Sequence, residues 1–261
     1  MKRDPRTLLA ACLALILGQV VSVAEENAGI PSGGLQPMHI DPLDAGRASA
    51  LHRGPNPHAG LTPQQHMEVA AQHMAAGRHP QAMAVLTQAL AKYPDNAELF
   101  NMRAALELQQ QDIKGALADM EQAVKLAPEN PLYRVTRAQL YLRFERREEA
   151  LKDLDAAVLL VPDLVPARFN RGALLANLGR EKEALADFDH CIAVEPHLPA
   201  PWFNRGSMYR ALGEKEKARA DIRRFIELAE EPRWKQAGRD LLRAWDQADG
   251  RAVAETAEKQ P

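Results

Sequence analysis

The sequence predicts an all-α fold, an α-solenoid of five antiparallel helix pairs followed by one C-terminal capping helix. Three observations carry this prediction: a proline that recurs every 34 residues, small residues that keep the same register, and two apolar runs at helical spacing in every repeat. Hydrophobic residues make up 46% of the 261 residues and aromatic residues only 5%, which favours packing by Ala and Leu on helices.

The proline column fixes the period of the repeat. We place this proline at position 32, and its four occurrences are Pro94, Pro128, Pro162 and Pro196. Position 20 is then alanine in all five repeats, and position 24 is always a large apolar residue. Columns that stay in phase over so many repeats are not expected by chance. The predicted repeats cover residues 63–96, 97–130, 131–164, 165–198 and 199–231.

Small residues at positions 8 and 20 mark the place where the two helices of a repeat cross. A larger side chain there would push the helix axes apart, so a bulky residue in place of Ala184 is expected to cost about 1–3 kcal/mol. Cys191 stands at position 27, where the other repeats before the last have alanine. We therefore interpret this thiol as a packing residue rather than as a reactive group.

Positions 7 and 23 change their character together. They hold arginine and aspartate in repeats two to five, whereas repeat one has Val69 and Val85. We infer that the two positions touch across the helix pair and that each Arg and Asp form a partly buried ion pair, contributing about 1 kcal/mol. The predicted pairs are Arg103–Asp119, Arg137–Asp153, Arg171–Asp187 and Arg205–Asp221.

Repeats four and five carry the fullest motif, Arg-Phe-Asn-Arg-Gly at 168–172 and Trp-Phe-Asn-Arg-Gly at 202–206. Together with the small, aromatic and proline columns, these segments resemble the tetratricopeptide repeat family over residues 63–232. The first repeat departs from the family pattern, because His66 and His73 stand where aromatic rings are usual. The resemblance implies a protein-binding scaffold whose concave face is formed by the first helix of each pair.

The resemblance also implies which residues line that groove. We predict a protein or peptide partner, held by amide side chains that both donate and accept hydrogen bonds and by two exposed Phe rings. Leu132, Val135 and Gln139 would extend the surface into repeat three. The predicted contact residues in repeats four and five are Phe169, Asn170, Asn177, Phe203, Asn204, Ser207 and Arg210.

An alternative function is copper binding by the His- and Met-containing segment 38–83. Imidazole and thioether groups are donors that suit copper, although their spacing here matches no fixed coordination motif. In the repeat register His66 and His73 fall at ring-packing positions, which favours a structural role for both. The candidate ligands are His39, His52, His58, His66, Met67, His73 and Met74.

The sequence indicates neither catalysis nor nucleic-acid binding. It contains no nucleophile elbow, phosphate-binding glycine loop or zinc-protease helix, so we predict a protein that is not an enzyme and needs no cofactor. The formal net charge of −2 argues against a general phosphate-backbone binder. Homo-oligomerisation through the groove or the capping helix stays open.

Residues 1–24 have the three parts of a secretory signal. Lys2 and Arg3 are basic, an apolar run follows, and small residues precede a cleavage point after Ala24. We predict export, with a periplasmic location. The alternatives are a membrane anchor formed by the uncleaved signal and a lipid attached at Cys12.

The segments on either side of the repeats have different compositions. Residues 25–62 are rich in Pro and Gly and are predicted to be a flexible segment. Residues 232–248 carry Trp234, Leu241 and Trp245 on one face and are predicted to form the capping helix. Residues 249–261 are predicted to be a disordered tail.

Overall fold

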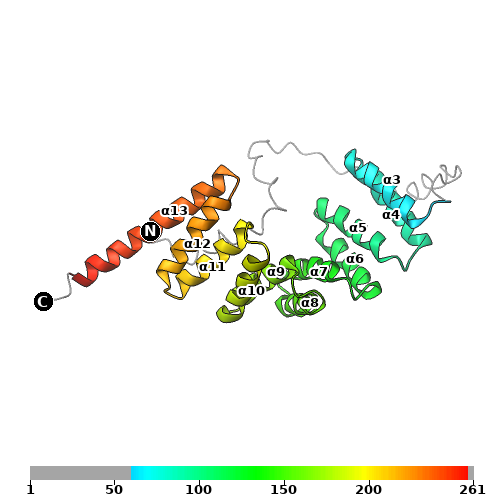
Figure 1. The fold of residues 1–261 in the computed structure, drawn as a ribbon. Coiled ribbons are helices and arrows are strands. Elements are labelled where there is room, and N and C mark those ends of the chain that lie inside the picture. The colour runs from blue at the N-terminus through cyan, green and yellow to red at the C-terminus, as the bar shows by residue number, and fades with distance from the viewer. Residues whose placement is uncertain (1–59, 258–261) are drawn as a thin grey trace, which may run out of the picture. The chain divides into compact units, whose positions relative to one another are not determined.

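The computed structural model describes residues 60–257, with side chains up to residue 250. Within this range the regular secondary structure consists of helices, without strands. The chain divides into two units, Met1–His66 and Met67–Pro261, which are described separately. The predicted all-α class is confirmed (Figure 1). The helices are α3 (Pro63–Ala75), α4 (His79–Lys92), α5 (Ala97–Gln109), α6 (Ile113–Leu126), α7 (Pro131–Arg143), α8 (Arg147–Leu160), α9 (Val165–Asn177), α10 (Glu181–Val194), α11 (Pro199–Ala211), α12 (Lys215–Leu228) and α13 (Pro232–Ala257).

The described part of the first unit contains the beginning of α3. The Thr62 backbone N–H donates to Gln65 Oε1 at 2.9 Å, and the Gln65 backbone N–H donates to Thr62 Oγ1 at 3.3 Å. This reciprocal arrangement is a capping box, which satisfies N–H groups that have no acceptor within the helix. Pro63 fits the first helical position because a proline lacks the N–H group that would be left unpaired there.

The second unit repeats one helix pair. α5 packs against α6, α7 against α8, α9 against α10 and α11 against α12, and each second helix also packs on the first helix of the next repeat. The turn between the two helices has a left-handed residue at position 15, which is glycine at Gly77, Gly179 and Gly213. Gln111 and Glu145 adopt the same backbone conformation with φ of 62° and 58°. The turn is therefore retained even where the residue disfavours it.

The loops between repeats end one helix and cap the next. Asn96 accepts a hydrogen bond from the Leu99 N–H at 2.9 Å, and Asn130 accepts one from the Leu132 N–H at 3.0 Å. Both asparagines stand at the residue before a first helix, where a side-chain oxygen satisfies a free N–H group. The local sequence thus sets the boundary of α5 and of α7.

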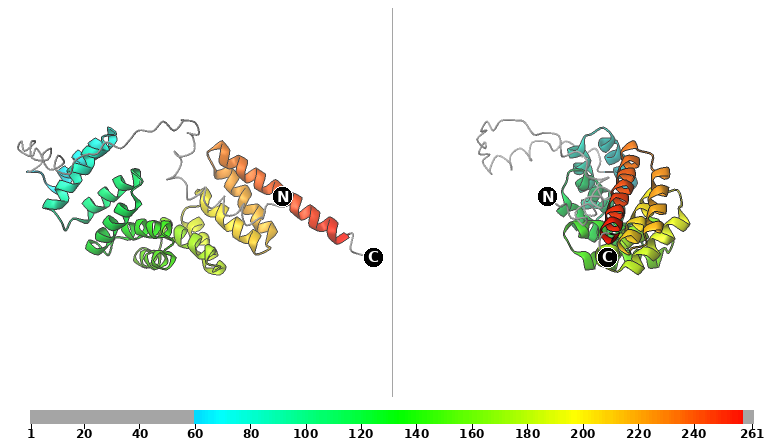
Figure 2. Two further views of the ribbon diagram at one scale, coloured as in Figure 1. Left: turned by 180° about the vertical axis from the view of Figure 1, so that it is seen from behind. Right: turned by 90° about the vertical axis from the view of Figure 1, so that its left-hand side faces the viewer.

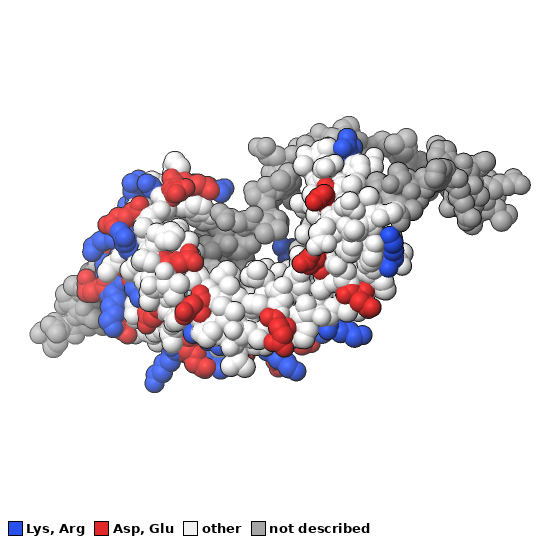
Figure 3. Space-filling view, turned by 45° about the vertical axis from the view of Figure 1, so that its right-hand side comes forward, with Lys and Arg blue, Asp and Glu red and all other residues white. Residues whose placement is uncertain are grey.

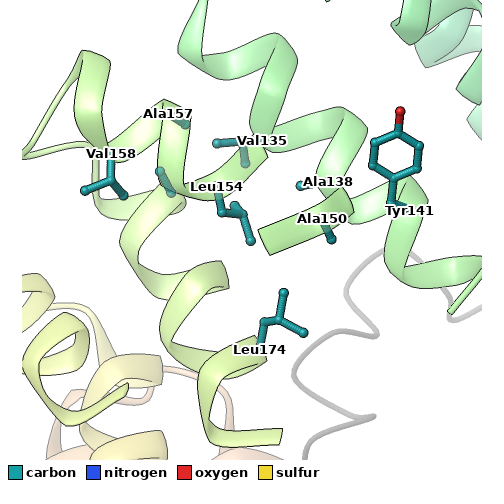
Figure 4. Packing of buried hydrophobic residues seen from close by; sticks show 9 residues of the cluster. Val135, Ala138, Tyr141, Ala150, Leu154, Ala157, Val158 and Leu174 are labelled. Atoms are coloured by element: carbon teal, nitrogen blue, oxygen red, sulfur yellow. The ribbon is translucent and has the colours of Figure 1, made fainter. Parts of the chain in front are cut away.

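The core is built from small residues at the crossings and larger apolar residues between them. The five alanines at position 20 are 0% exposed. A Cβ atom added at Gly172 would lie 3.0 Å from Phe188 Cε1, so the helices of repeat four approach too closely for any larger residue to fit without movement. Figure 4 shows one such cluster, in which Val135 on α7, Leu154 on α8 and Leu174 on α9 pack together.

Helix α13 is longer than the sequence indicated. The predicted end was residue 248, but the helix continues to Ala257, and Figures 1 and 2 show its C-terminal part extending past α12. Asp249, assigned to a disordered tail, instead lies inside the helix and is paired with Arg210 and Lys215 at 2.9 Å each. A helix face that is fixed by such ion pairs need not be apolar, which is why the hydrophobic pattern ended too early.

The predicted signal at 1–24 and the segment up to residue 59 lie outside the described residues. Within the described part of the chain, no helix combines the length and the apolar character that a membrane span requires.

Candidate partner-binding surface

The predicted ion pairs between positions 7 and 23 are confirmed in all four repeats. In each, the arginine Nε and Nη2 donate to the two carboxylate oxygens of the aspartate, at 2.6–2.8 Å. The aspartates are buried, with Asp187 only 1% exposed. Hydrogen bonds to these aspartates raise the pKa of Arg171 and Arg205 above the ordinary value. In repeat one Val69 and Val85 belong to one apolar cluster, so the exchange of a charged for an apolar pair is also explained.

Two of these arginines also join neighbouring repeats. Arg171 Nη1 lies 2.9 Å from Asp155 Oδ1 on α8, and Arg205 Nη1 lies 2.8 Å from Asp189 Oδ1 on α10. Each guanidinium group therefore links the two helices of its own repeat to the second helix of the preceding one. Sequence reasoning missed this link, although Asp155 and Asp189 stand in the same repeat column.

In repeats three to five, the side chain at position 4 forms a hydrogen bond with the loop that contains the proline of the preceding repeat. Arg134 Nε donates to the Pro128 carbonyl at 2.9 Å, and Trp202 Nε1 donates to the Pro196 carbonyl at 3.0 Å. Proline has no N–H group but keeps its carbonyl acceptor, so a donor at position 4 of the next helix fixes the loop. This contact orients the first helices of repeats three to five, on which the predicted groove residues lie.

The two phenylalanines of the predicted site are not the exposed rings that we expected. Phe203 is 6% exposed and packs against Phe225 on α12, with ring centroids 5.1 Å apart. Phe169 is half-buried and lies 6.1 Å from Phe188 on α10. The expectation of two exposed rings is therefore wrong. Position 5 turns its ring towards the second helix of the repeat, where an aromatic contact buries most of it.

Two polar side chains of the predicted site, Asn170 and Ser207, form hydrogen bonds within their own helix. Asn170 and Asn204 are each 7% exposed, and Asn170 Nδ2 donates to the Pro166 carbonyl at 2.7 Å. Ser207 Oγ donates to the Phe203 carbonyl at 2.9 Å. Within the described part of the chain, Asn170 Oδ1 and Asn204 Oδ1 both lack a hydrogen-bond donor, so either oxygen could receive one from a partner.

Some of the remaining predicted contact residues are paired or buried within the protein, and others are exposed to solvent. Arg210 donates to Asp249 on α13 at 2.9 and 3.0 Å and lies over the Trp245 ring, so it attaches the capping helix. Asn177, in contrast, is exposed at the end of α9. On α7, Leu132 is 54% exposed while Val135 is buried. The accessible part of the predicted surface therefore lies on α7 and α9 rather than on α11.

Three of the four candidate copper ligands in the described residues are packing residues, and the fourth, His73, accepts a hydrogen bond from Arg78 Nε at 3.1 Å. His66 is 2% exposed, and its Nδ1 lies 2.9 Å from the Thr62 carbonyl oxygen. Met67 and Met74 pack against the apolar cluster around Leu86. No group of three or more metal-binding side chains is found among the residues that the structure describes. His39, His52 and His58 lie outside those residues.

Cys191 is the packing residue that the sequence indicated. It is 0% exposed, and its Sγ lies 3.7 Å from the Val165 carbonyl oxygen. Burial raises the pKa of this thiol to about 12. The thiolate, which is the reactive form, is therefore disfavoured at neutral pH.

One face of the described part of the chain, drawn in Figure 3, shows no single dominant charge. On this face Asp and Glu are scattered between broad neutral areas, and Lys and Arg lie mainly towards the margin. Helix pairs stacked in this way, with polar and apolar side chains mixed on the first helices, define an α-solenoid scaffold.

Family models confirm which solenoid this is. Models described as tetratricopeptide repeat match residues 72–131, 138–200 and 200–232, which together make up more than half of the chain. The chain belongs to the tetratricopeptide repeat family, and its fold is that of a protein-protein interaction scaffold. A search of curated proteins found no match.

Solved structures with the same fold are distant in sequence. The MamA protein is 15% identical with a TM-score of 0.58, and the match covers 64% of this chain and 91% of MamA. YrrB, described as a TPR protein with an unusual peptide-binding site, is 22% identical with a TM-score of 0.57, covering 67% and 90%. TTC0263, a thermophilic TPR protein of Thermus thermophilus, is 22% identical with a TM-score of 0.55, covering 69% and 99%. At these identities the likeness concerns the fold alone.

Proposed function

We propose that this protein is an exported adaptor that binds a peptide-like segment of a partner protein along the first helices of its repeats. The observation that carries the proposal is the exposure of mixed apolar and amide side chains on adjacent first helices. Leu132 near the start of α7 and Asn177 at the end of α9 are exposed, and Phe169, also on α9, is half-buried. α7 and α9 are in direct contact, so these side chains belong to one part of the array.

The chemistry of this surface favours an extended or helical peptide with apolar side chains. Leu132 and the accessible edge of Phe169 offer apolar contact that tolerates different partners. Asn170 Oδ1 can accept a hydrogen bond, and the Asn177 amide can both donate and accept. On α11, Phe203 and Asn204 are buried, Ser207 bonds to its own helix and Arg210 pairs with Asp249, so we centre the proposed site on α7 and α9.

The scaffold is suited to this role because its surface is formed before the partner arrives. Hydrogen bonds and ion pairs within each repeat fix the first helices, so little conformational entropy is lost by the protein on binding. A transient complex with a dissociation constant in the micromolar range, or about −8 kcal/mol, is the expectation.

Site-specific photo-cross-linking in the native cell tests the surface. A photoreactive residue replaces Leu132 or Asn177, and the control replaces Glu216, whose side chain is 89% exposed on α12. The proposal predicts one discrete product from both test positions and none from the control. Equal labelling at all three positions would exclude this surface.

The export proposal has its own test. Intact-mass measurement of the protein from the native cell envelope is expected to show a chain that begins at Glu25. A chain that retains residues 1–24 would leave the membrane-anchored alternative, and added lipid mass would support lipidation.

A further inference from the structure

Glu107 is an acidic residue at a position of the repeat that is largely buried. It stands at position 11 on α5, where repeats three and five have Tyr141 and Tyr209. Its side chain is only 12% exposed, and its Oε2 is buried without a hydrogen-bond partner. A buried carboxylate oxygen that lacks a donor is strongly disfavoured, whereas an aromatic ring at the same position is not.

The space for this carboxyl group comes from Gly115 on α6. A Cβ atom added at Gly115 would lie 3.0 Å from Glu107 Cδ and 2.6 Å from Asp112 Oδ2. None of the other repeats has glycine at this position, which holds Gln81, Glu149, Glu183 and Lys217. The Glu107 carboxyl group is therefore enclosed against the backbone of α6, and it belongs to the contact that holds the two helices together.

The charged groups that face Glu107 come from α5, α6 and the turn between them. Arg103 Nε lies 4.0 Å from Glu107 Oε1, but this guanidinium group already donates to both oxygens of Asp119, at 2.6 and 2.7 Å. Asp112 in the turn adds a further negative charge. Glu107 thus interacts with two other carboxylates and with one arginine, which is already paired with Asp119. Burial first, and then the charge of Asp119, raise the pKa of Glu107 to about 7, against the attraction of Arg103.

We propose that Glu107 makes the second repeat a proton-operated latch, in which the neutral acid holds α5 against α6 and ionisation loosens this helix pair. The neutral carboxyl group has an O–H that can donate to Asp119, so the unpaired oxygen gains a partner. The ionised group loses that hydrogen bond and is repelled by Asp119. Because each repeat is held by its nearest neighbours, a loosened α5–α6 pair also weakens the packing of α4 and α7.

The direction of the effect follows from the raised pKa. An unfolded glutamate has a pKa of about 4.3, so the folded protein binds this proton more tightly than the unfolded chain does. The stabilisation is complete below about pH 4.3 and is lost as the pH rises through about 7. The latch is closed in mild acid and open in mild alkali, whatever partner the groove binds.

Urea unfolding of the full chain between about pH 5 and about pH 8.5, on either side of the pKa of about 7 of Glu107, tests the latch. The variants are Glu107→Gln, which is neutral at every pH, and Glu98→Gln, an exposed control on the same helix. As the pH rises, the urea concentration at the unfolding midpoint is expected to fall by the same amount for the wild type and for Glu98→Gln. For Glu107→Gln this fall is expected to be absent. A Glu107→Gln profile parallel to the wild type would overturn the proposal.

A second measurement needs no variant. Carbon-13 NMR of the Glu107 carboxyl group in the unaltered protein is expected to show a titration midpoint near pH 7. Amide hydrogen exchange in α5 and α6, corrected for the intrinsic pH dependence, is expected to speed up above that pH. A midpoint near the ordinary value of about 4.3, or exchange that does not change, would contradict the latch.

Discussion

Arg205 and Asp221 are joined by two hydrogen bonds of 2.8 Å across the helices of repeat five, from Nε to Oδ2 and from Nη2 to Oδ1. The same arrangement recurs in three other repeats, always between residues 16 positions apart. Asp221 is 4% exposed, and among the described residues its side chain pairs with Arg205 alone. Breaking this pair should therefore lower the free energy of unfolding more than breaking a surface ion pair would, because loss of one member leaves a buried charge unpaired.

The first prediction concerns this pair. Arg205→Val should destabilise the protein by about 3 kcal/mol, since the Asp221 charge stays buried without its donors. The double variant Arg205→Val/Asp221→Val copies the apolar pair Val69 and Val85 of repeat one and should recover most of that loss. Urea unfolding of the single and double variants provides the measurement. A double variant as unstable as the sum of its two single changes would show that the pair is not coupled.

The second prediction concerns the helix crossing of repeat four. Ala184 is 0% exposed, and a Cβ atom added at Gly172 on the facing helix would lie 3.0 Å from Phe188 Cε1, so this crossing is tightly packed. Ala184→Leu should therefore lower the free energy of unfolding by about 1–3 kcal/mol through overpacking. Ala186→Leu, on an exposed face of the same helix, is the matched control and should change it by less than about 0.5 kcal/mol. Thermal unfolding distinguishes the two.

The third prediction concerns the strained turn of repeat three. Glu145 has a φ of 58°, a conformation that glycine adopts in the equivalent turn at Gly179. Glu145→Gly should stabilise the protein by about 0.5–1 kcal/mol, because relief of the left-handed strain exceeds the extra entropy of the unfolded chain. Glu148→Gly, in the first turn of α8, should destabilise it instead. No gain in the urea midpoint for Glu145→Gly would show that the turn is not strained.

The fourth prediction concerns the capping helix and pH. Hydrogen bonds from Arg210 and Lys215 hold the pKa of Asp249 well below its usual range. A depressed pKa stabilises the fold above the unfolded value of about 3.9, and this contribution is lost as the pH falls further. Hydrogen exchange of α13 should therefore accelerate in acid.

Asp249→Asn should show faster exchange of α13 already at neutral pH and a weaker response to acid. Asp246→Asn is the control, because this carboxylate is 65% exposed and pairs only with Arg219 among the residues described. If both variants exchange alike, the ion pairs of Asp249 do not hold the capping helix.

The fold was predictable because its causes are local and repeated. Pro128 and Pro162 end second helices in the same register, and Ala150 and Ala184 mark the crossings, so each repeat confirms the assignment of the others. The exchange of Arg and Asp for Val69 and Val85 revealed a tertiary contact without any structure. The groove was harder to predict, because a helix position gives the direction of a side chain but not what covers it.

Three outcomes depended on neighbours that the repeat pattern does not encode. Phe203 is buried because Phe225, a large residue at a normally small position, lies against its ring. Arg210 donates a hydrogen bond to Asp249, a residue that the hydrophobic pattern had placed outside the capping helix. In the sequence Glu107 looks like an ordinary surface acid. Its carboxyl group is buried because Gly115 has no side chain, which lets the carboxyl group pack against α6.

The sequence by itself determined the number of repeats, their boundaries, their small crossing residues and their Arg–Asp pairs, because each of these follows from a period that side chains must keep in order to pack. Only the tertiary structure decided which groove residues are accessible, where the last helix ends and which carboxyl group lacks a donor. Those properties depend on distances between residues of different helices, and such distances are set when the repeats stack and not by the residues of any one repeat.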